Sequence, residues 1–243
     1  DAQESRGLGD VYKRQTLDAA QKQALQNALR NFVLGGAELV GDNKTRYAAI
    51  QERMAELSQK FSENALDATD KFSLFVTEVE LDGVPEDVKT TARAAAEKDG
   101  QAGFKLTLKM PCYLPVMQFA KSSALRQKLY QAYVTRASDQ SDPAFAALDN
   151  SQNIQEILQL RQEEAQLLGY QNYAEVSVAT KMADSPSKVI GFLRDLAQRA
   201  KPYAQQDLED MRQFAAQHLN VKGPQAWDWP YIGEKLKEAR YAF

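Results

Sequence analysis

The fold class is indicated most clearly by residues 185–218, which read SPSKVIGFLRDLAQRAKPYAQQDLEDMRQFAAQH. Ser185 can cap a helix, and Pro186 suits the first turn because the N–H group that proline lacks would be unpaired there. Apolar side chains then recur every three or four residues, which places them on one face of an amphipathic helix. They are Ile190, Leu193, Leu196, Ala197, Ala200, Ala204, Leu208, Met211, Phe214 and Ala215. Pro202 should kink or split this helix, since it removes one backbone hydrogen bond.

The same spacing predicts helices on both sides of this stretch. One helix should begin at Asp18, with Gln21 completing a capping box, and should end at Gly35. Others are predicted over 47–65, 85–98 and from Ser122, and another from Asp149, capped with Gln152, to Gly169. A last helix should start at Tyr231. The apolar positions that carry these predictions are Leu25, Ala28, Leu29, Phe32, Val33, Tyr47, Ile50, Met54, Leu57, Phe61, Ala65, Leu125, Leu129, Ile154, Ile157, Leu158, Ala165 and Leu168.

Two short segments have a different period, with apolar residues at every second position. The first contains Phe72, Leu74 and Val76, and the second alternates from Phe104 to Met110. Alternation of this kind is typical of half-buried strands. The pattern therefore predicts a mainly α fold with a small two-stranded β element, the second strand region ending at the prolines after Met110.

Composition limits the classes of function. Lys and Arg number 30 against 33 Asp and Glu, which gives a net charge of −3 and argues against a dedicated nucleic-acid binder. No apolar run approaches the ~20 residues of a membrane span, so we expect a soluble chain without a membrane partner. With 1 cysteine and 1 histidine, the chain has neither a disulfide framework nor a mechanism that needs two histidines.

Residues 1–15 differ in character from the rest of the chain. Residues 5–15 read SRGLGDVYKRQ, without a helical or strand period, and match the in-frame translation of a transposase-end sequencing adapter. We expect 1–15 to be a non-native scar that packs against nothing, with the natural N-terminus missing. Gly7 and Gly9 do not form a dinucleotide-binding loop, because Tyr12 stands where its third glycine would be.

Few residues could carry chemistry. His218 comes after Phe214 on one helix face, which indicates a partly buried histidine near a helix end. As a metal ligand it would need a second ligating side chain one helical turn away, where the sequence has Phe214 and Lys222. Cys112 could be a nucleophile only beside a base, and nothing local supplies one, which favours a small core thiol.

The carboxylates and the tryptophans can likewise be interpreted as structural or as functional residues. We interpret two groups of carboxylates as solvated helix faces and not as catalytic pairs. They are Glu163 with Glu164, and Asp207 with Glu209 and Asp210. A catalytic pair of carboxylates needs the geometry of a cleft, which the spacing in a sequence cannot show. Trp227 and Trp229 flank Asp228, as packing anchors or, less favoured, as a stacking platform. The residues alone therefore assign no catalytic and no metal residue, and substrate-binding residues stay unknown.

A resemblance adds to this interpretation. Residues 157–170 read ILQLRQEEAQLLGY, and with 172–174 and 181–183 this stretch resembles the thimet-type zinc oligopeptidases, most closely their bacterial members. Further stretches agree in order with the same family, so that the resemblance covers 16–243. They are 27–32, 66–69, 113–117, 135–139, 227–228, Tyr231 and 234–235.

The resemblance implies a helical shell of the zincin type around a deep channel, and zinc-dependent cleavage of short peptides in the cytoplasm by a monomer. In that family two histidines of a His-Glu-x-x-His helix bind zinc and the glutamate is the general base. This chain has no such motif, so no zinc is expected in it. We interpret 16–121 as the end of an N-terminal helical region and 122–243 as the opening helices of the peptidase domain, truncated before the zinc site. A non-catalytic helical interaction module on the same scaffold is the alternative.

Overall fold

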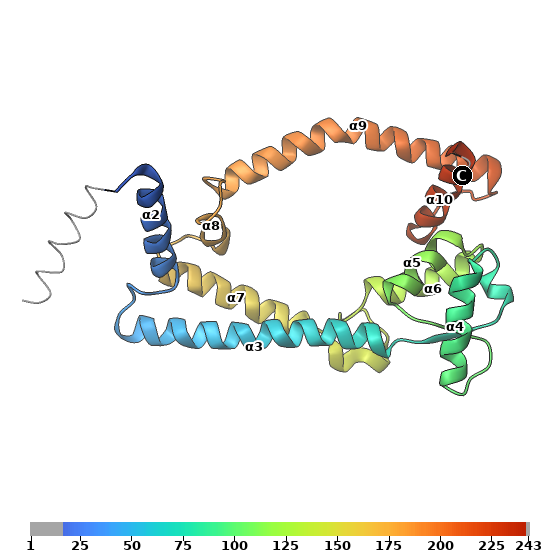
Figure 1. Ribbon diagram of the computed structural model, residues 1–243, viewed down its shortest axis with the longest axis horizontal. Coiled ribbons are helices and arrows are strands. Elements are labelled where there is room, and N and C mark those ends of the chain that lie inside the picture. The colour runs from blue at the N-terminus through green and yellow to red at the C-terminus, as the bar shows by residue number, and fades with distance from the viewer. Residues whose placement is uncertain (1–16, 242–243) are drawn as a thin grey trace, which may run out of the picture. The chain divides into compact units, whose positions relative to one another are not determined.

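A computed structural model describes residues 17–241, so the prediction about residues 1–15 lies outside the described part. Figure 1 shows helices joined by short connections, with one small sheet. The α-helices are α2 (Ala19–Leu34), α3 (Gly41–Lys71), α4 (Glu86–Lys98), α5 (Met110–Phe119), α6 (Ser123–Val134), α7 (Ser151–Leu167), α8 (Tyr173–Val178), α9 (Pro186–His218) and α10 (Trp229–Tyr241). The strands are β1 (Leu74–Val76) and β2 (Phe104–Leu106), and the 3-10 turns are η1 (Val79–Leu81), η2 (Pro143–Leu148) and η3 (Ala226–Asp228). The predicted mainly α class is confirmed.

The described chain divides into two compact units. The first holds the described residues up to Leu57 together with Glu156–Asp195, and the second holds Ser58–Gln155 and the described residues from Leu196. The long helices α3 and α9 each contribute one end to each unit. Within residues 17–241, no helix combines the length and apolar character that crossing a bilayer requires.

Helix α2 begins and ends where the sequence predicts. The Asp18 carboxylate accepts a hydrogen bond from the Gln21 backbone at 2.8 Å, and the Gln21 side chain accepts one from the Asp18 backbone at 3.1 Å. The helix closes at Gly35, and Tyr47 donates a hydrogen bond to the carbonyl of Leu34 at 2.9 Å. None of its residues is buried.

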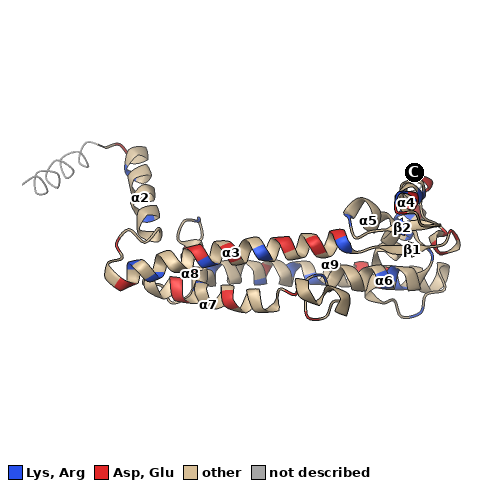
Figure 2. Cartoon of the chain, turned by 90° about the horizontal axis from the view of Figure 1, so that it is seen from below, with Lys and Arg blue, Asp and Glu red and all other residues tan. Residues whose placement is uncertain are grey.

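In the first unit, α3 and α7 lie side by side (Figures 1 and 2). Their apolar contact consists of Ile50, Leu57 and Leu160, with Met54 and Ile157 packed against these. The edges of the contact carry two ion pairs between exposed side chains, Arg46 with Glu163 and Arg53 with Glu156. Figure 2 shows acidic and basic residues together along α3, as expected for a helix with one solvated face.

Helix α7 begins close to its predicted position, but its cap differs. Asp149 accepts hydrogen bonds from the backbone N–H and the hydroxyl of Ser151, at 2.8 and 2.7 Å, and not from Gln152. A serine two residues on can supply both donors, so this turn closes one residue earlier than a capping box would. Gly169 comes after the helix with a positive φ of 80°, as predicted for a helix end.

The sheet in the second unit is shorter than the alternation predicts. Strand β1 pairs antiparallel with β2, Leu74 facing Leu106 and Val76 facing Phe104. The prediction that the second strand extends to Met110 is wrong, because Met110 begins α5. Pro111 then stands in the first turn of that helix, where a missing N–H costs nothing.

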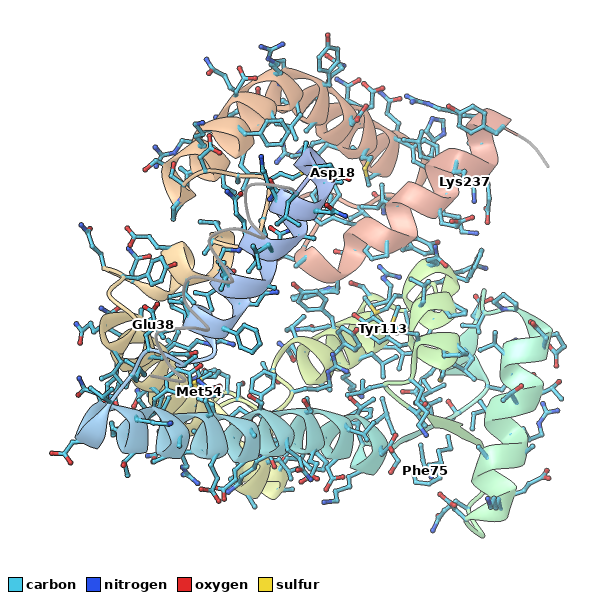
Figure 3. The ribbon with its side chains drawn as sticks, turned by 60° about the vertical axis from the view of Figure 1, so that its left-hand side comes forward. Asp18, Glu38, Met54, Phe75, Tyr113 and Lys237 are labelled. Carbon is cyan, nitrogen blue, oxygen red and sulfur yellow. The ribbon has the colours of Figure 1, made fainter. Side chains whose placement is uncertain are left out.

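The main hydrophobic core lies in the second unit, between the sheet, α4, α5 and α6. Helix α4 packs on β2, and α5 packs on both α6 and α10. Tyr113, labelled on α5 in Figure 3, stacks on Tyr133 of α6 with ring centroids 4.2 Å apart. The fully or almost fully buried members include Leu81, Leu106, Leu108, Val116, Met117, Ala120, Leu125 and Leu129.

Helix α9 is continuous from Pro186 to His218, so Pro202 does not split it, and of the two expected effects only a kink stays a prediction. The surrounding turn is exposed to solvent, and water can therefore satisfy the carbonyl of Gln198 that proline leaves without a donor. Ser185 accepts a hydrogen bond from the backbone of Lys188 at 3.2 Å, which confirms the predicted start.

We predict that Gly83→Ala destabilises the second unit more than Gly100→Ala. Both glycines have a positive φ, 91° and 69°, which costs a residue with a side chain about 1–2 kcal/mol. Only at position 83 would the new methyl meet backbone, 2.4 Å from the carbonyl oxygen of Phe119, and overpacking of this kind adds about 1–3 kcal/mol. Urea denaturation measures both free energies of unfolding, and equal losses would contradict the predicted clash.

Candidate functional site

The most deeply buried charged groups in the described chain are Arg126 on α6 and Asp228 at the end of η3. Their side chains are 1% and 6% exposed, and a guanidinium nitrogen of Arg126 lies 2.6 Å from Oδ1 of Asp228. The two residues come from distant parts of the sequence and both belong to the second unit. Burial of a charge is costly unless it is paired and hydrogen-bonded, so the surroundings of this pair decide its role.

Arg126 finds further acceptors on backbone carbonyls. It donates to the carbonyl of Lys121 at 3.2 Å, to that of Trp227 at 3.3 Å and to that of Ala120. Its guanidinium carbon also lies 4.4 Å from the centre of the Tyr231 ring, a distance at which a cation and an aromatic face attract. Arginine can serve so many partners because its planar group carries five donors.

Asp228 is held by donors from three directions. Ser123 donates its hydroxyl hydrogen to Oδ1 at 2.8 Å, and the backbone N–H of Gln225 donates to Oδ2 at 2.9 Å. Trp227 donates its indole N–H to the Ser123 hydroxyl at 3.1 Å. Burial alone would raise the pKa of Asp228, but the hydrogen bonds from Gln225, Arg126 and Ser123 outweigh it and hold this pKa below its ordinary value.

The polar atoms of this cluster are all hydrogen-bonded to one another or to the backbone, so its role is to hold the fold together. Both carboxylate oxygens of Asp228 and all three guanidinium nitrogens of Arg126 have protein partners. Neither group can therefore reach a reacting atom without giving up a buried partner. The cluster fastens α6 to the start of α10, and the pair is a positioning element and not a catalytic one.

The sequence contains a feature that predicts this cluster, although the helix prediction does not depend on it. Arg126 lies three residues before Leu129 and so stands on the buried face of α6, where a cation needs a buried partner. Asp228 lies three residues after Gln225 in a capping arrangement. The charge of Arg126 at an apolar-face position therefore indicates a buried ion pair. The tryptophans on either side of Asp228 do not indicate one.

His218 and Cys112 do not form a site. The expectation that His218 is partly buried is wrong, since it is exposed at the end of α9, with its ring 4.8 Å from that of Phe214. Cys112 is half-buried against the main core, where its sulfur accepts a hydrogen bond from the backbone of Thr107 at 3.4 Å. In the described part of the chain, no basic side chain is hydrogen-bonded to this thiol, and its position suits a small core residue.

The two adjacent glutamates on α7 have different surroundings. Glu163 is partly exposed and accepts two hydrogen bonds from Arg46, both 2.6 Å long, which lower the pKa of Glu163. The prediction of a solvated face is wrong for Glu164, which is only 7% exposed because α3 covers it. Gln51 of α3 donates to one oxygen of Glu164 at 2.9 Å, and the other oxygen has no protein partner.

The remaining candidate carboxylates and Trp227 contact other side chains of the protein. Asp210 pairs with Arg240 at 2.7 Å, and Gln213 donates to Glu209 at 3.0 Å, both at the surface. Trp227 is half-buried, with its ring tilted against Tyr130 at 6.2 Å between centroids. Its hydrogen bond to Ser123 and this ring contact favour packing over a stacking platform.

The residues present do not fit a zinc site. Among residues 17–241, no three His, Cys, Asp or Glu side chains lie close enough together to hold a metal ion. A catalytic zinc usually has three protein ligands, most often including histidines. The single histidine, His218, therefore lacks the partners that such a centre needs.

Comparison with known proteins shows which family the chain is similar to. Residues 116–243 match the model of peptidase family M3. Oligopeptidase A of Salmonella typhimurium and that of Escherichia coli are each 47% identical over 96% of this chain and 34% of their own length. Probable cytosolic oligopeptidase A of Arabidopsis thaliana is 38% identical over 93% of this chain. The chain spans about a third of the length of these curated relatives.

We predict that Arg126→Met lowers the stability of the second unit by about 3–5 kcal/mol, because it leaves the Asp228 carboxylate buried without its cation. Trp227 and Trp229 flank Asp228 and are the 2 tryptophans of the chain, so tryptophan fluorescence during urea denaturation reports on this cluster.

Arg212→Met is the matched control, since Arg212 belongs to the same unit, is half exposed, and its partner Glu209 lies at the surface. Its effect should be clearly smaller than that of Arg126→Met. Equal effects of the two substitutions would contradict a special role of the buried pair.

Proposed function

We propose, because the chain belongs to peptidase family M3, that it is part of a zinc-dependent oligopeptidase that hydrolyses short peptides. The observation that carries this proposal is the family match over residues 116–243, together with 47% identity to two bacterial oligopeptidases A. Those relatives act on oligopeptides according to their names. The proposal extends this activity to the protein of which the chain forms a part.

Within that protein, we assign 16–121 to the end of an N-terminal helical region and 122–243 to the opening helices of the peptidase domain. The buried Arg126–Asp228 pair supports a common unit for α6 and α10, since it joins both helices. Residues 1–15 are assigned to an adapter-derived scar. These boundaries come from the resemblance of individual stretches to the family.

The zinc and the general base are assigned to parts of the protein outside this chain. The donor set among residues 17–241 does not fit a metal, and the chain spans about a third of its relatives. No catalytic step is therefore derived for the residues of this chain. Their part in the function is to build a wall of the proposed channel, whose narrowness would exclude folded proteins.

A cytoplasmic monomer is the setting that we propose for the whole protein. One relative is named a probable cytosolic oligopeptidase A, which supports the compartment. A non-catalytic interaction module on the same scaffold is the competing outcome. The source reading frame beyond the codon of Phe243 distinguishes the two, because the oligopeptidase requires a His-Glu-x-x-His helix there and the module requires a stop codon.

We predict that purified 1–243 retains no stoichiometric zinc and hydrolyses no peptide, because it lacks a pair of histidines and a base between them. Metal analysis after dialysis and cleavage of a fluorogenic peptide measure the two properties, with the Escherichia coli relative as the positive control for hydrolysis. One firmly bound zinc per chain with chelator-sensitive hydrolysis would overturn the assignment of the catalytic groups to other parts of the protein.

We also predict that a chimera is active in which residues 16–243 replace the aligned segment of Escherichia coli oligopeptidase A. The 47% identity indicates that the same contacts can form with the remaining two thirds of that enzyme. Peptide hydrolysis, and its loss and recovery on chelation and return of zinc, are the measurements. A chimera that melts like the parent enzyme but cleaves no peptide would count against the proposed function.

A further inference from the structure

A hollow of about 460 Å³ in the second unit belongs to none of the groups described so far. It lies against α6 and the segment after it, and we call it the α6 hollow. Its size is within the ~300–1,000 Å³ of small-molecule sites. Its lining consists of Ala68, Phe72, Leu108, Lys128, Gln131, Ala132, Thr135, Arg136, Ala137, Gln140, Ser141, Asp142 and Phe145.

Part of the lining of the α6 hollow is apolar. Leu108 and Ala68 belong to the buried core, while Phe72 and Phe145 are half-buried. Such a surface favours an apolar group of the ligand, because burial removes hydrocarbon from water on both sides. The hollow is large enough to take a large apolar side chain.

Arg136 is held in a fixed orientation at the α6 hollow. Its Nε donates to the carbonyl of Tyr133 at 2.8 Å, and one of its terminal nitrogens donates to the hydroxyl of Thr69 at 2.8 Å. The guanidinium carbon lies 3.7 Å from the centre of the Tyr133 ring. These contacts leave the other terminal nitrogen available, and no carboxylate in the described chain forms an ion pair with Arg136.

Lys128 adds a second cation to the lining. It is exposed and forms no ion pair among residues 17–241, although it lies near enough to Glu80 to help lower the pKa of that carboxyl. Asp142 is the one carboxylate of the lining, and it accepts a hydrogen bond from the backbone of Ala144 at 2.9 Å. With two cations against one carboxylate, the lining of the α6 hollow has a net positive charge beside its apolar residues, which favours an anion with an apolar body.

The segment 135–139 contributes Thr135, Arg136 and Ala137 to the lining, and its backbone is held in place. Ala137 has a positive φ of 50°, a conformation that costs a non-glycine residue free energy. Its carbonyl accepts a hydrogen bond from the backbone of Asn150 at 3.0 Å, and Ser138 donates to the carbonyl of Thr135 at 2.7 Å. This segment therefore needs little ordering when a ligand binds, which favours affinity.

We propose that the α6 hollow binds a carboxylate that carries one apolar side chain, with the side chain over Phe72 and Phe145 and the carboxylate on Arg136 and Lys128. The available terminal nitrogen of Arg136 can donate a charge-assisted hydrogen bond to one carboxylate oxygen, and Lys128 adds a point charge for the other. The C-terminal residue of a peptide and a free N-acylated amino acid share this chemistry. The proposal concerns a site outside the catalytic centre and stands independently of the peptidase activity.

The test uses the full 243-residue chain with alanine methyl groups labelled with ¹³C for NMR. N-acetylphenylalanine and N-acetyl-Ala-Ala-Phe are titrated against their C-terminal amides. We expect shifts at the methyls of Ala68, Ala132 and Ala137 with both acids, and at least tenfold weaker binding of both amides. Tighter binding of the tripeptide would identify the peptide terminus as the ligand, and equal binding the single residue.

Lys128→Met should weaken binding at least threefold and Arg136→Met at least tenfold. Lys60→Met is the matched control, because Lys60 is an exposed lysine of α3 outside the lining. Since Arg136 also supports the fold through Thr69, the Lys128 variant keeps the test independent of folding. No shifts at the three methyls, equal binding of acid and amide, or equal effects of the Lys128 and Lys60 substitutions would overturn the proposal.

Discussion

Arg126 and Asp228 form the most deeply buried ion pair of the described chain, and the junction of α6 with the turn before α10 depends on it. The two side chains lie 2.6 Å apart and are almost completely excluded from solvent. A charge in that position is tolerated only while its partner and hydrogen bonds stay in place. The turn before α10 and the position of α6 are therefore coupled, and Trp227 packs against the main core beside this pair. Helix α10 also packs on α5, which makes this the central junction of the unit.

The first unit depends on an apolar contact between helices and not on a buried ion pair. There α3 and α7 share a narrow apolar contact of Ile50, Leu57 and Leu160, and their ion pairs are exposed to water and salt. Surface pairs of this kind orient helices but add little free energy. Glu164 is the exception, because α3 buries it and one of its oxygens has no protein partner. The second unit thus contains one ion pair that is almost completely buried and fully hydrogen-bonded, whereas the pairs between α3 and α7 in the first unit are solvated.

Local sequence patterns were sufficient for most elements and insufficient for the junction. The caps at Asp18 and Ser185 and the stop at Gly169 were predictable, because each depends on residues within one turn. The strand end near Met110 and the continuity of α9 through Pro202 were not, since they depend on packing and on solvent access. Arg126 and Asp228 are 102 residues apart in sequence, and no local pattern states that they meet. The family resemblance supplied the peptidase assignment, which the lone His218 could not.

The double-mutant cycle of Arg126→Met and Asp228→Asn tests the central role of this junction most directly. The free energies of unfolding of the chain, both single variants and the double variant are measured by tryptophan fluorescence in urea. If the pair acts as one buried unit, the double variant loses clearly less than the sum of the single losses, with a coupling of roughly 1–3 kcal/mol. Losses that add within about 0.5 kcal/mol would show that the two residues act independently and would contradict the account.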